Sequence, residues 1–179
     1  MASFTAFHDS IHQRPAARSR HTPVDTAVRW LDIATRFSAT GGLLTGAELM
    51  RQMRERWTAN GLVHPTPDPV STLARWVVTG SVVSVESPWG PLLPRFQFDP
   101  ATATAHPAMR PLLQVLRPVF DGTELALWFV TPNDWLDDQS PAQAMHARLS
   151  LVLMAARLDR HVACGAVASP IGATAHRRR

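Results

Sequence analysis

Histidines are the first residues to test for chemistry in this chain, because an imidazole can bind a metal or transfer a proton near neutral pH. His8 and His12 are four residues apart, a spacing that lets two imidazoles on one helix chelate a metal, but they lie in a polar segment without helical periodicity. His146 and His161 are expected on one long helix, without cysteine or carboxylate at ligand spacing. We therefore expect solvated or capping histidines, and no metal site.

The remaining reactive groups also favour structural roles. Asp137 and Asp138 could form an acid–base or metal pair, but they precede a capping box over 140–143, where acids are stabilised by the helix dipole. The single cysteine, Cys164, excludes an intramolecular disulfide, fits a reducing cytoplasm and is more typical of a small buried residue than of a nucleophile. We therefore predict no cofactor and no enzyme activity, and a small hydrolase or transferase is the weakest alternative.

The absence of lysine excludes several enzyme classes. All 18 basic residues are arginine, which removes the Walker-type phosphate loop, the Schiff-base lysine and the lysine of kinases. The net charge of +4 comes from the chain ends, because residues 22–176 hold 12 arginines against 13 acids. Terminal arginines attract any polyanion without positioning it, so this charge does not indicate a folded nucleic-acid-binding face.

Helical periodicity predicts a mainly α fold with one short β-hairpin. No run approaches the roughly 18–20 apolar residues of a membrane span, and the first residues lack the pattern of a secretory signal, so we expect a cytoplasmic protein without a membrane partner. Capping residues, glycines and prolines delimit helices at about 22–38, 45–60, 70–79, 107–120, 123–131 and 140–162. The hairpin is expected from strands at 81–85 and 92–98, and the core of the second half from Leu112, Leu116, Trp128, Leu136 and Leu153.

The segment 45–80 is typical of a helix–turn–helix. It opens at a capping box, Thr45 to Glu48, and continues through a proline-rich connector to the 70–79 helix, where Val70, Leu73, Ala74, Trp76 and Val77 are the expected apolar face. If this helix reads DNA, its polar face offers Ser71, Thr72 and Arg75. Arg75 is the best candidate, because arginine can donate two hydrogen bonds to guanine.

Two patches resemble a known family. Residues 93–99 read LPRFQFD, and residues 128–141 read WFVTPNDWLDDQSP, followed by a helix rich in alanine and leucine. This pairing resembles the Xre/MbcA/ParS-like antitoxins. Their C-terminal toxin-binding domain has a tryptophan or aromatic helix, then Pro-Asn, a leucine, two usually small residues, and Ser/Thr-Pro opening a helix. Asn133, Leu136, Ser140 and Pro141 fit that pattern, whereas Asp137 and Asp138 stand where glycines are usual.

The resemblance implies a type II antitoxin that sequesters a cognate RES-type, NAD-consuming toxin and represses its own operon by binding operator DNA. It implies toxin contacts around Asn133, Trp135, Leu136, Ser140 and Pro141, with Arg177, Arg178 and Arg179 as tail anchors in an anionic pocket. A solubilising tail is an equal reading of those arginines. The expected organisation is a basic arm (1–21), a helix–turn–helix-like unit with the hairpin (22–99), a toxin-binding-like domain (100–165) and a basic tail (166–179), in a homo-oligomer or a hetero-complex. The alternative is a stand-alone DNA-binding regulator without a toxin.

Overall fold

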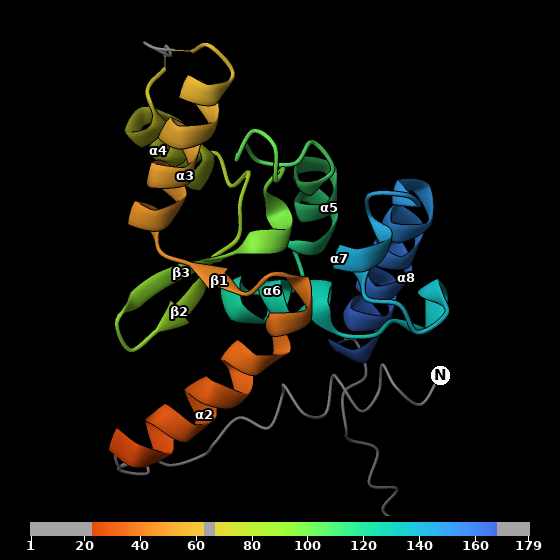
Figure 1. Ribbon diagram of the computed structural model, residues 1–179. Coiled ribbons are helices and arrows are strands. Elements are labelled where there is room, and N and C mark those ends of the chain that lie inside the picture. The colour runs from red at the N-terminus through yellow and green to blue at the C-terminus, as the bar shows by residue number, and fades with distance from the viewer. Residues whose placement is uncertain (1–22, 63–66, 168–179) are drawn as a thin grey trace, which may run out of the picture.

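The computed structural model describes residues 23–62 and 67–167, and there the protein is mainly helical with one small antiparallel sheet (Figure 1). The sequence predicts this fold class correctly. His8, His12, the arm 1–21 and Arg177 to Arg179 lie outside the described residues. Within the described ranges, no helix is both long and apolar enough to cross a membrane.

The N-terminal helices begin close to the predicted positions. They are α2 (Pro23–Arg36), the 3-10 helix η1 (Ser38–Thr40), α3 (Gly46–Ala59) and α4 (Pro69–Val78). The predicted capping box of α3 is confirmed, because the Glu48 N–H donates to Thr45 Oγ1 at 3.1 Å and the Thr45 N–H donates to Glu48 Oε2 at 2.8 Å. The connection from α3 to α4 runs over residues 60–68. It is longer than the three- or four-residue turn of a helix–turn–helix.

The described residues also form a small three-stranded antiparallel sheet. Its order is β1 (Leu43–Leu44), β3 (Gly90–Pro94) and β2 (Val85–Ser87). A β2–β3 hairpin is present as predicted, with Ser87 opposite Gly90. Its strand positions differ from the prediction, because β2 shares only Val85 with the strand expected at 81–85, and β3 ends at Pro94. The sequence does not predict β1, because two residues are too few to show an alternation.

The strand predicted over 92–98 does not continue through Gln97. The 3-10 helix η2 (Arg95–Gln97) follows β3 directly, and Phe96, Gln97 and Phe98 are all buried. The Val83 N–H donates to Gln97 Oε1 at 2.8 Å, and Gln97 Nε2 donates to the Val83 carbonyl at 2.9 Å. The side-chain amide therefore pairs with backbone groups that would otherwise be unsatisfied in the interior.

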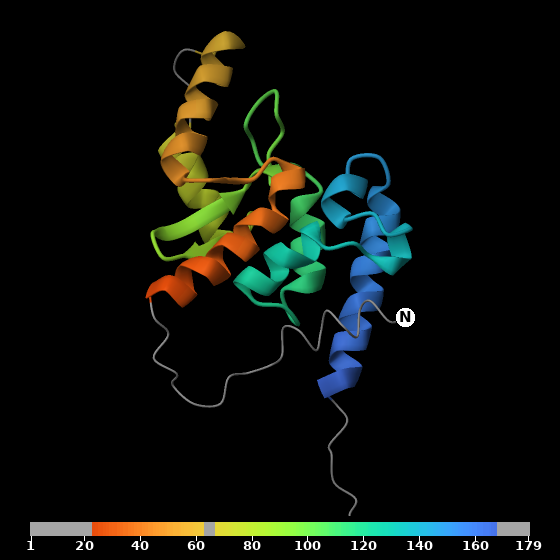
Figure 2. The same ribbon diagram turned by 60° about the horizontal axis from the view of Figure 1, so that its bottom comes forward.

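The second half is helical, but the single helix predicted over 140–162 is wrong. Its elements are α5 (Met109–Leu116), α6 (Gly122–Val130), the 3-10 helix η3 (Asp134–Leu136), α7 (Pro141–Ala144) and α8 (Leu149–Val167). The chain tightens after α7, where the Ala147 N–H donates to the Ala144 carbonyl at 3.2 Å. The Arg148 side chain reaches back to the loop before α7, and α8 begins at the next residue, Leu149. Figure 2 shows α8 as the long helix along one side of the molecule.

The main core crosses the domain boundary predicted at residue 99. Trp30, Phe37 and Phe96 belong to the same buried cluster as the apolar faces of α5, α6 and α8. Of the predicted core residues, Leu112, Leu116, Trp128 and Leu136 are buried, and Leu153 is partly buried. A second cluster lies under α3 and α4, where Leu49, Met53 and Trp57 form the predicted apolar face of α3.

Candidate protein-binding site in the C-terminal helices

The 128–141 motif folds as the expected helix–loop–helix. α6 ends at Val130, and Asn133 Oδ1 accepts a hydrogen bond from the Trp135 N–H at 3.0 Å, which forms an Asx turn. Leu136 is fully buried. Ser140 caps α7 in a capping box with Gln143. The predicted core position of Leu136 and the predicted capping box at 140–143 are confirmed, and all three roles are structural.

A buried carboxylate fastens this loop to α8. Asp159 is 1% exposed. Its Oδ2 accepts from Trp128 Nε1 and from Asn133 Nδ2, both at 2.8 Å, and its Oδ1 accepts from Trp135 Nε1 at 3.0 Å. Burial raises the pKa of the Asp159 carboxyl, and the three hydrogen bonds lower it in part. A buried carboxylate ordinarily needs a cation beside it, and here three uncharged hydrogen-bond donors take that position.

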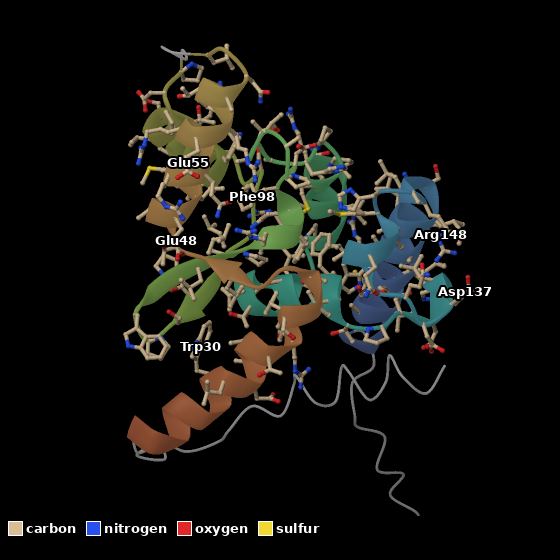
Figure 3. The ribbon with its side chains drawn as sticks, viewed as in Figure 1. Trp30, Glu48, Glu55, Phe98, Asp137 and Arg148 are labelled. Atoms are coloured by element: carbon tan, nitrogen blue, oxygen red, sulfur yellow. The ribbon has the colours of Figure 1, made fainter. Side chains whose placement is uncertain are left out.

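The two aspartates at the glycine positions of the motif adopt the backbone conformation that glycine favours. Asp137 has φ of 56° and Asp138 has φ of 60°, both in the left-handed region. Asp137 also pairs with Arg148, whose Nη1 donates to Asp137 Oδ2 at 3.1 Å (Figure 3). Arg148 Nη2 further donates to the Leu136 carbonyl at 3.2 Å and to the side chain of Gln139. Two successive aspartates therefore hold the left-handed turn of this loop, and Arg148 pairs with the first of them.

Four of the five predicted toxin-contact residues that the structure describes are buried. Asn133, Leu136, Ser140 and Pro141 are buried, so they position the loop and cannot form a contact surface. Trp135 is the exception in this set, at 40% exposed. Its indole is held against α8 by Asp159, so its open edge borders that helix. The four buried residues therefore have structural roles, and toxin binding by the loop that they shape stays a prediction.

Of the three residues predicted to read DNA, Ser71 and Arg75 are exposed four positions apart on α4, and Thr72 is buried. Thr72 is 4% exposed, and its hydroxyl donates to the Pro67 carbonyl at 3.4 Å, so its expected place on a polar face is wrong. The Ser71 hydroxyl donates to Asp68 Oδ2 at 3.0 Å. Arg75 is exposed, as expected.

The apolar face expected for α4 is also partly wrong. Val70 and Val77 are 58% and 59% exposed, and the neighbouring Val78 is 86% exposed. Leu73 and Trp76 pack partly against the second cluster. The helix packs through Pro69 and Thr72 together with those two side chains, and Asp68 caps its first turn. The exposed face of α4 therefore carries valines beside the polar Ser71 and Arg75.

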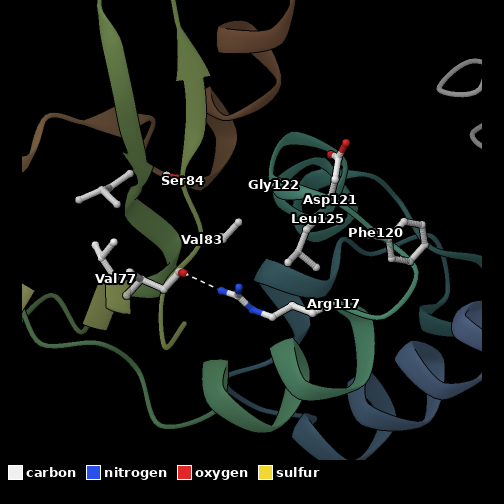
Figure 4. Close-up of a pocket in the computed structure, with 10 residues that line it drawn as sticks. Val77, Val83, Ser84, Arg117, Phe120, Asp121, Gly122 and Leu125 are labelled. Atoms are coloured by element: carbon white, nitrogen blue, oxygen red, sulfur yellow. Dashed lines mark hydrogen bonds between the residues drawn. The ribbon is translucent and has the colours of Figure 1, made fainter. Parts of the chain in front are cut away.

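A cavity of about 290 Å³ lies between α4, the segment before β2 and the connection from α5 to α6 (Figure 4). Arg117 lines it and donates through Nη2 to the carbonyls of Gly80 and Val82, at 3.0 and 3.1 Å. Asp121, which also lines it, caps α6 in a capping box with Glu124. The charged groups of this cavity are thus engaged in holding elements together, and the other lining side chains are mostly apolar.

The remaining candidates for chemistry are separated or singly placed. His146 lies between α7 and α8 and contacts the ring of His106 edge to face, with centroids 4.7 Å apart, whereas His161 is on α8. Cys164 is exposed, contrary to the buried position expected for it. Within the described ranges, no group of three or more histidine, cysteine or acidic side chains could hold a metal ion.

Two functional residues of this region, Asp159 and Arg148, were not predicted. Asp159 is the only acid of α8 and stands at helical spacing with Ala155, Ala156 and Ala163, all buried. An acid on the apolar face of a helix indicates a buried partner. That signal could have found Asp159. Arg148 gives no comparable signal, because its role depends on the break between α7 and α8.

Comparisons with protein-family models, with curated proteins and with solved structures found no match for this chain.

Proposed function

We propose that this protein is an antitoxin that binds and sequesters a cognate protein toxin, of the RES-type, NAD-consuming class, through its C-terminal helices. The observation that carries the proposal is the Asp159 cluster. Trp128, Asn133 and Trp135, which all belong to the motif that resembles the antitoxin family, converge on one buried carboxylate of α8. These hydrogen bonds join the motif loop and α8 into one rigid unit, which we call the platform. The polar groups of the motif stabilise this platform.

The distribution of exposed residues supports binding by α8 and its neighbours over a catalytic role. The platform leaves Trp135 and one face of α8 open to solvent. His106 and His146 contact each other, and neither of them hydrogen-bonds a hydroxyl or a thiol in the described structure. An arrangement without a base beside a nucleophile favours recognition as the function.

The geometry favours toxin binding over the stand-alone regulator. A DNA-reading helix needs side chains on its exposed face that reach base edges. On α4, Arg75 is exposed, but Thr72 is buried and the open face carries Val70 and Val77. Operon repression through α4 therefore has weaker support than binding through the C-terminal helices.

The test is co-expression with the product of the adjacent gene. We expect that product to arrest growth alone, and the full chain to restore growth and co-purify with it. A chain ending at Val167, where α8 ends, separates the platform from the predicted Arg177 to Arg179 anchors. If the tail anchors the toxin, this shortened chain should neutralise less well while keeping its fold. A neighbour that is harmless alone and never co-purifies would overturn the antitoxin proposal.

Gel shifts on the upstream DNA test the alternative function. Specific binding that is lost with Arg75→Ala, together with an inert neighbour, would replace the antitoxin by a regulator. Specificity is judged against unrelated DNA at the same salt concentration, because arginine contacts to phosphate bind any sequence.

A further inference from the structure

An apolar strip runs along the outer face of α8. Leu151, Met154 and Val162 are 40%, 44% and 44% exposed, and Leu158 between them is half-buried. Steps of three, four and four residues keep these positions on one side of a helix with 3.6 residues per turn. The opposite side of α8 packs through its buried residues against α5, η3 and α7. The strip itself has no partner within the described structure.

Basic side chains border this strip, and no exposed acid does so from α8. Arg157 and His161 are exposed and lie beside Met154 and Leu158 on the helical surface. The only acid of α8, Asp159, is buried and accepts three hydrogen bonds. The acids nearest in sequence, Asp137 and Asp138, belong to the loop before α7. The open surface of α8 is therefore apolar and basic.

We propose that the α8 strip docks an amphipathic helix of a partner protein whose apolar side chains are bordered by carboxylates. Charge complementarity selects this partner, because acids on its flank would pair with the Arg157 guanidinium and could accept a hydrogen bond from His161. A second copy of the strip would bring its own Arg157 against the first, so self-pairing through α8 is disfavoured. The inference rests on the proposed function insofar as the helix belongs to the toxin.

Trp135 adds a rigid aromatic edge to this surface. Its Nε1 donates to Asp159 of α8 at 3.0 Å, which fixes the indole beside the helix while 40% of the residue stays exposed. Tryptophan held in one orientation is the kind of residue that dominates protein interfaces. The surface thus combines an apolar strip, a fixed aromatic edge and a basic border.

The probes are three synthetic peptides of equal length added to the full chain. The first is an amphipathic helical peptide with a leucine strip bordered by glutamates, and the second carries lysines in place of the glutamates. The third has the composition of the first in an order that destroys the strip. Titration followed by tryptophan fluorescence and by calorimetry should show binding of the first peptide at least about tenfold tighter than either of the others.

Matched substitutions locate the binding on α8. Met154→Asp should weaken binding of the acidic peptide about tenfold or more, whereas Val78→Asp, at an exposed apolar position on α4, should not change it. Arg157→Glu should reverse the preference toward the lysine peptide, a gain that a misfolded variant cannot mimic. Arg160→Glu makes the same charge change on another side of α8 and should leave the preference intact.

The outcomes separate this inference from the proposed function. Equal binding of the three peptides, or equal loss with Met154→Asp and Val78→Asp, overturns the strip as a docking site. Sedimentation showing a dimer that Met154→Asp dissociates would make a second copy the occupant and overturn the acidic partner. If a toxin co-purifies equally with wild type and Met154→Asp, the antitoxin proposal stands, but the α8 strip is not where the toxin binds. Peptide binding that follows the variants, with an inert neighbouring gene, leaves the strip standing without the antitoxin.

Discussion

The indole Nε1 of Trp128 donates to Oδ2 of Asp159 at 2.8 Å, across 31 positions of sequence. This bond joins α6 to α8 in the interior, and Asn133 and Trp135 of the intervening loop donate to the same carboxylate. One acidic side chain thus holds the two helices and the loop between them. The loop is consequently expected to depend on Asp159 for its conformation, although Asp159 lies outside the motif.

Replacing Asp159 should destabilise the C-terminal helices. Asp159→Asn keeps the size of the side chain, but its amide NH₂ group must face at least one of the three donors, which then has no acceptor. An unsatisfied buried donor costs about 1–3 kcal/mol. Asp159→Ala removes the acceptor for all three donors and should lower the free energy of unfolding further. Urea unfolding at pH 7, followed by tryptophan fluorescence, measures both values.

Asp138→Asn is the matched control for this series. It makes the same chemical change at an exposed aspartate of the neighbouring loop, and surface substitutions of this kind usually shift stability by less than about 0.5 kcal/mol. An Asp159→Ala protein as stable as the control would show that the three hydrogen bonds contribute nothing, and the scaffold interpretation would be wrong.

Because the backbone at Asp138 is left-handed, replacement by glycine and replacement by alanine are expected to affect the free energy of unfolding differently. A residue with a Cβ at φ of 60° is strained relative to glycine, so Asp138→Gly should raise the free energy of unfolding by about 0.5–1 kcal/mol. Asp138→Ala loses the tolerance of aspartate for this region and should be neutral or destabilising. Asp138 is preferred to Asp137 for this test, because Asp137 also pairs with Arg148. Thermal unfolding that ranks alanine above glycine would contradict the prediction.

The sequence predicts local features of this fold better than it predicts how they are joined. The capping boxes at Thr45 and Ser140 and the buried Leu136 follow from short patterns, and the structure confirms them. At the break between α7 and α8, Arg148 contacts residues 9–12 positions away, which a helical period does not reveal. Local signals are visible in a short window, whereas such contacts are not.

The candidate site shows the same limit. Asn133, Ser140 and Pro141 belong to a recognisable motif, but their burial depends on how the motif packs against α8. Because they are buried, they stabilise the loop and do not form its outer surface. On α4, periodicity marks Val70 and Val77 as apolar, but Leu73 and Trp76 are the side chains that pack against the second cluster. The pattern gives the spacing of a face, and the packing partner decides whether that face is buried.

Gln97 should be intolerant of an apolar replacement despite its buried position. Its amide satisfies both the N–H and the carbonyl of Val83, at 2.8 and 2.9 Å. Gln97→Leu keeps the volume but leaves those two backbone groups unpaired, at about 1–3 kcal/mol for each group that water cannot reach. Gln97→Glu retains an acceptor for the Val83 N–H but sets a carboxylate against the carbonyl, and should also destabilise. Denaturant unfolding in which Gln97→Leu matches wild type would show that water replaces the amide.

Acid should destabilise the protein through His106. Burial and the charge of His146 lower the pKa of the His106 imidazole, and Asp99 raises it in part. Because the unfolded chain then binds the proton at higher pH than the folded chain, this contribution to stability is complete above the unfolded pKa of about 6.5. It is lost as the pH falls through that value toward the lower folded pKa. Protonation also removes the acceptor at Nδ1, which takes the Ala108 N–H at 3.2 Å just before α5.

His106→Asn separates this effect from general acid unfolding, because the Asn oxygen can accept from the Ala108 N–H and does not titrate. Between about pH 7 and pH 5, wild type should lose free energy of unfolding relative to this variant. His146→Asn removes the neighbouring imidazolium, so the His106 titration followed by NMR should move upward toward the ordinary value. Parallel pH profiles for wild type and His106→Asn would contradict the prediction. An unchanged His106 titration in His146→Asn would assign the lowered pKa to burial alone.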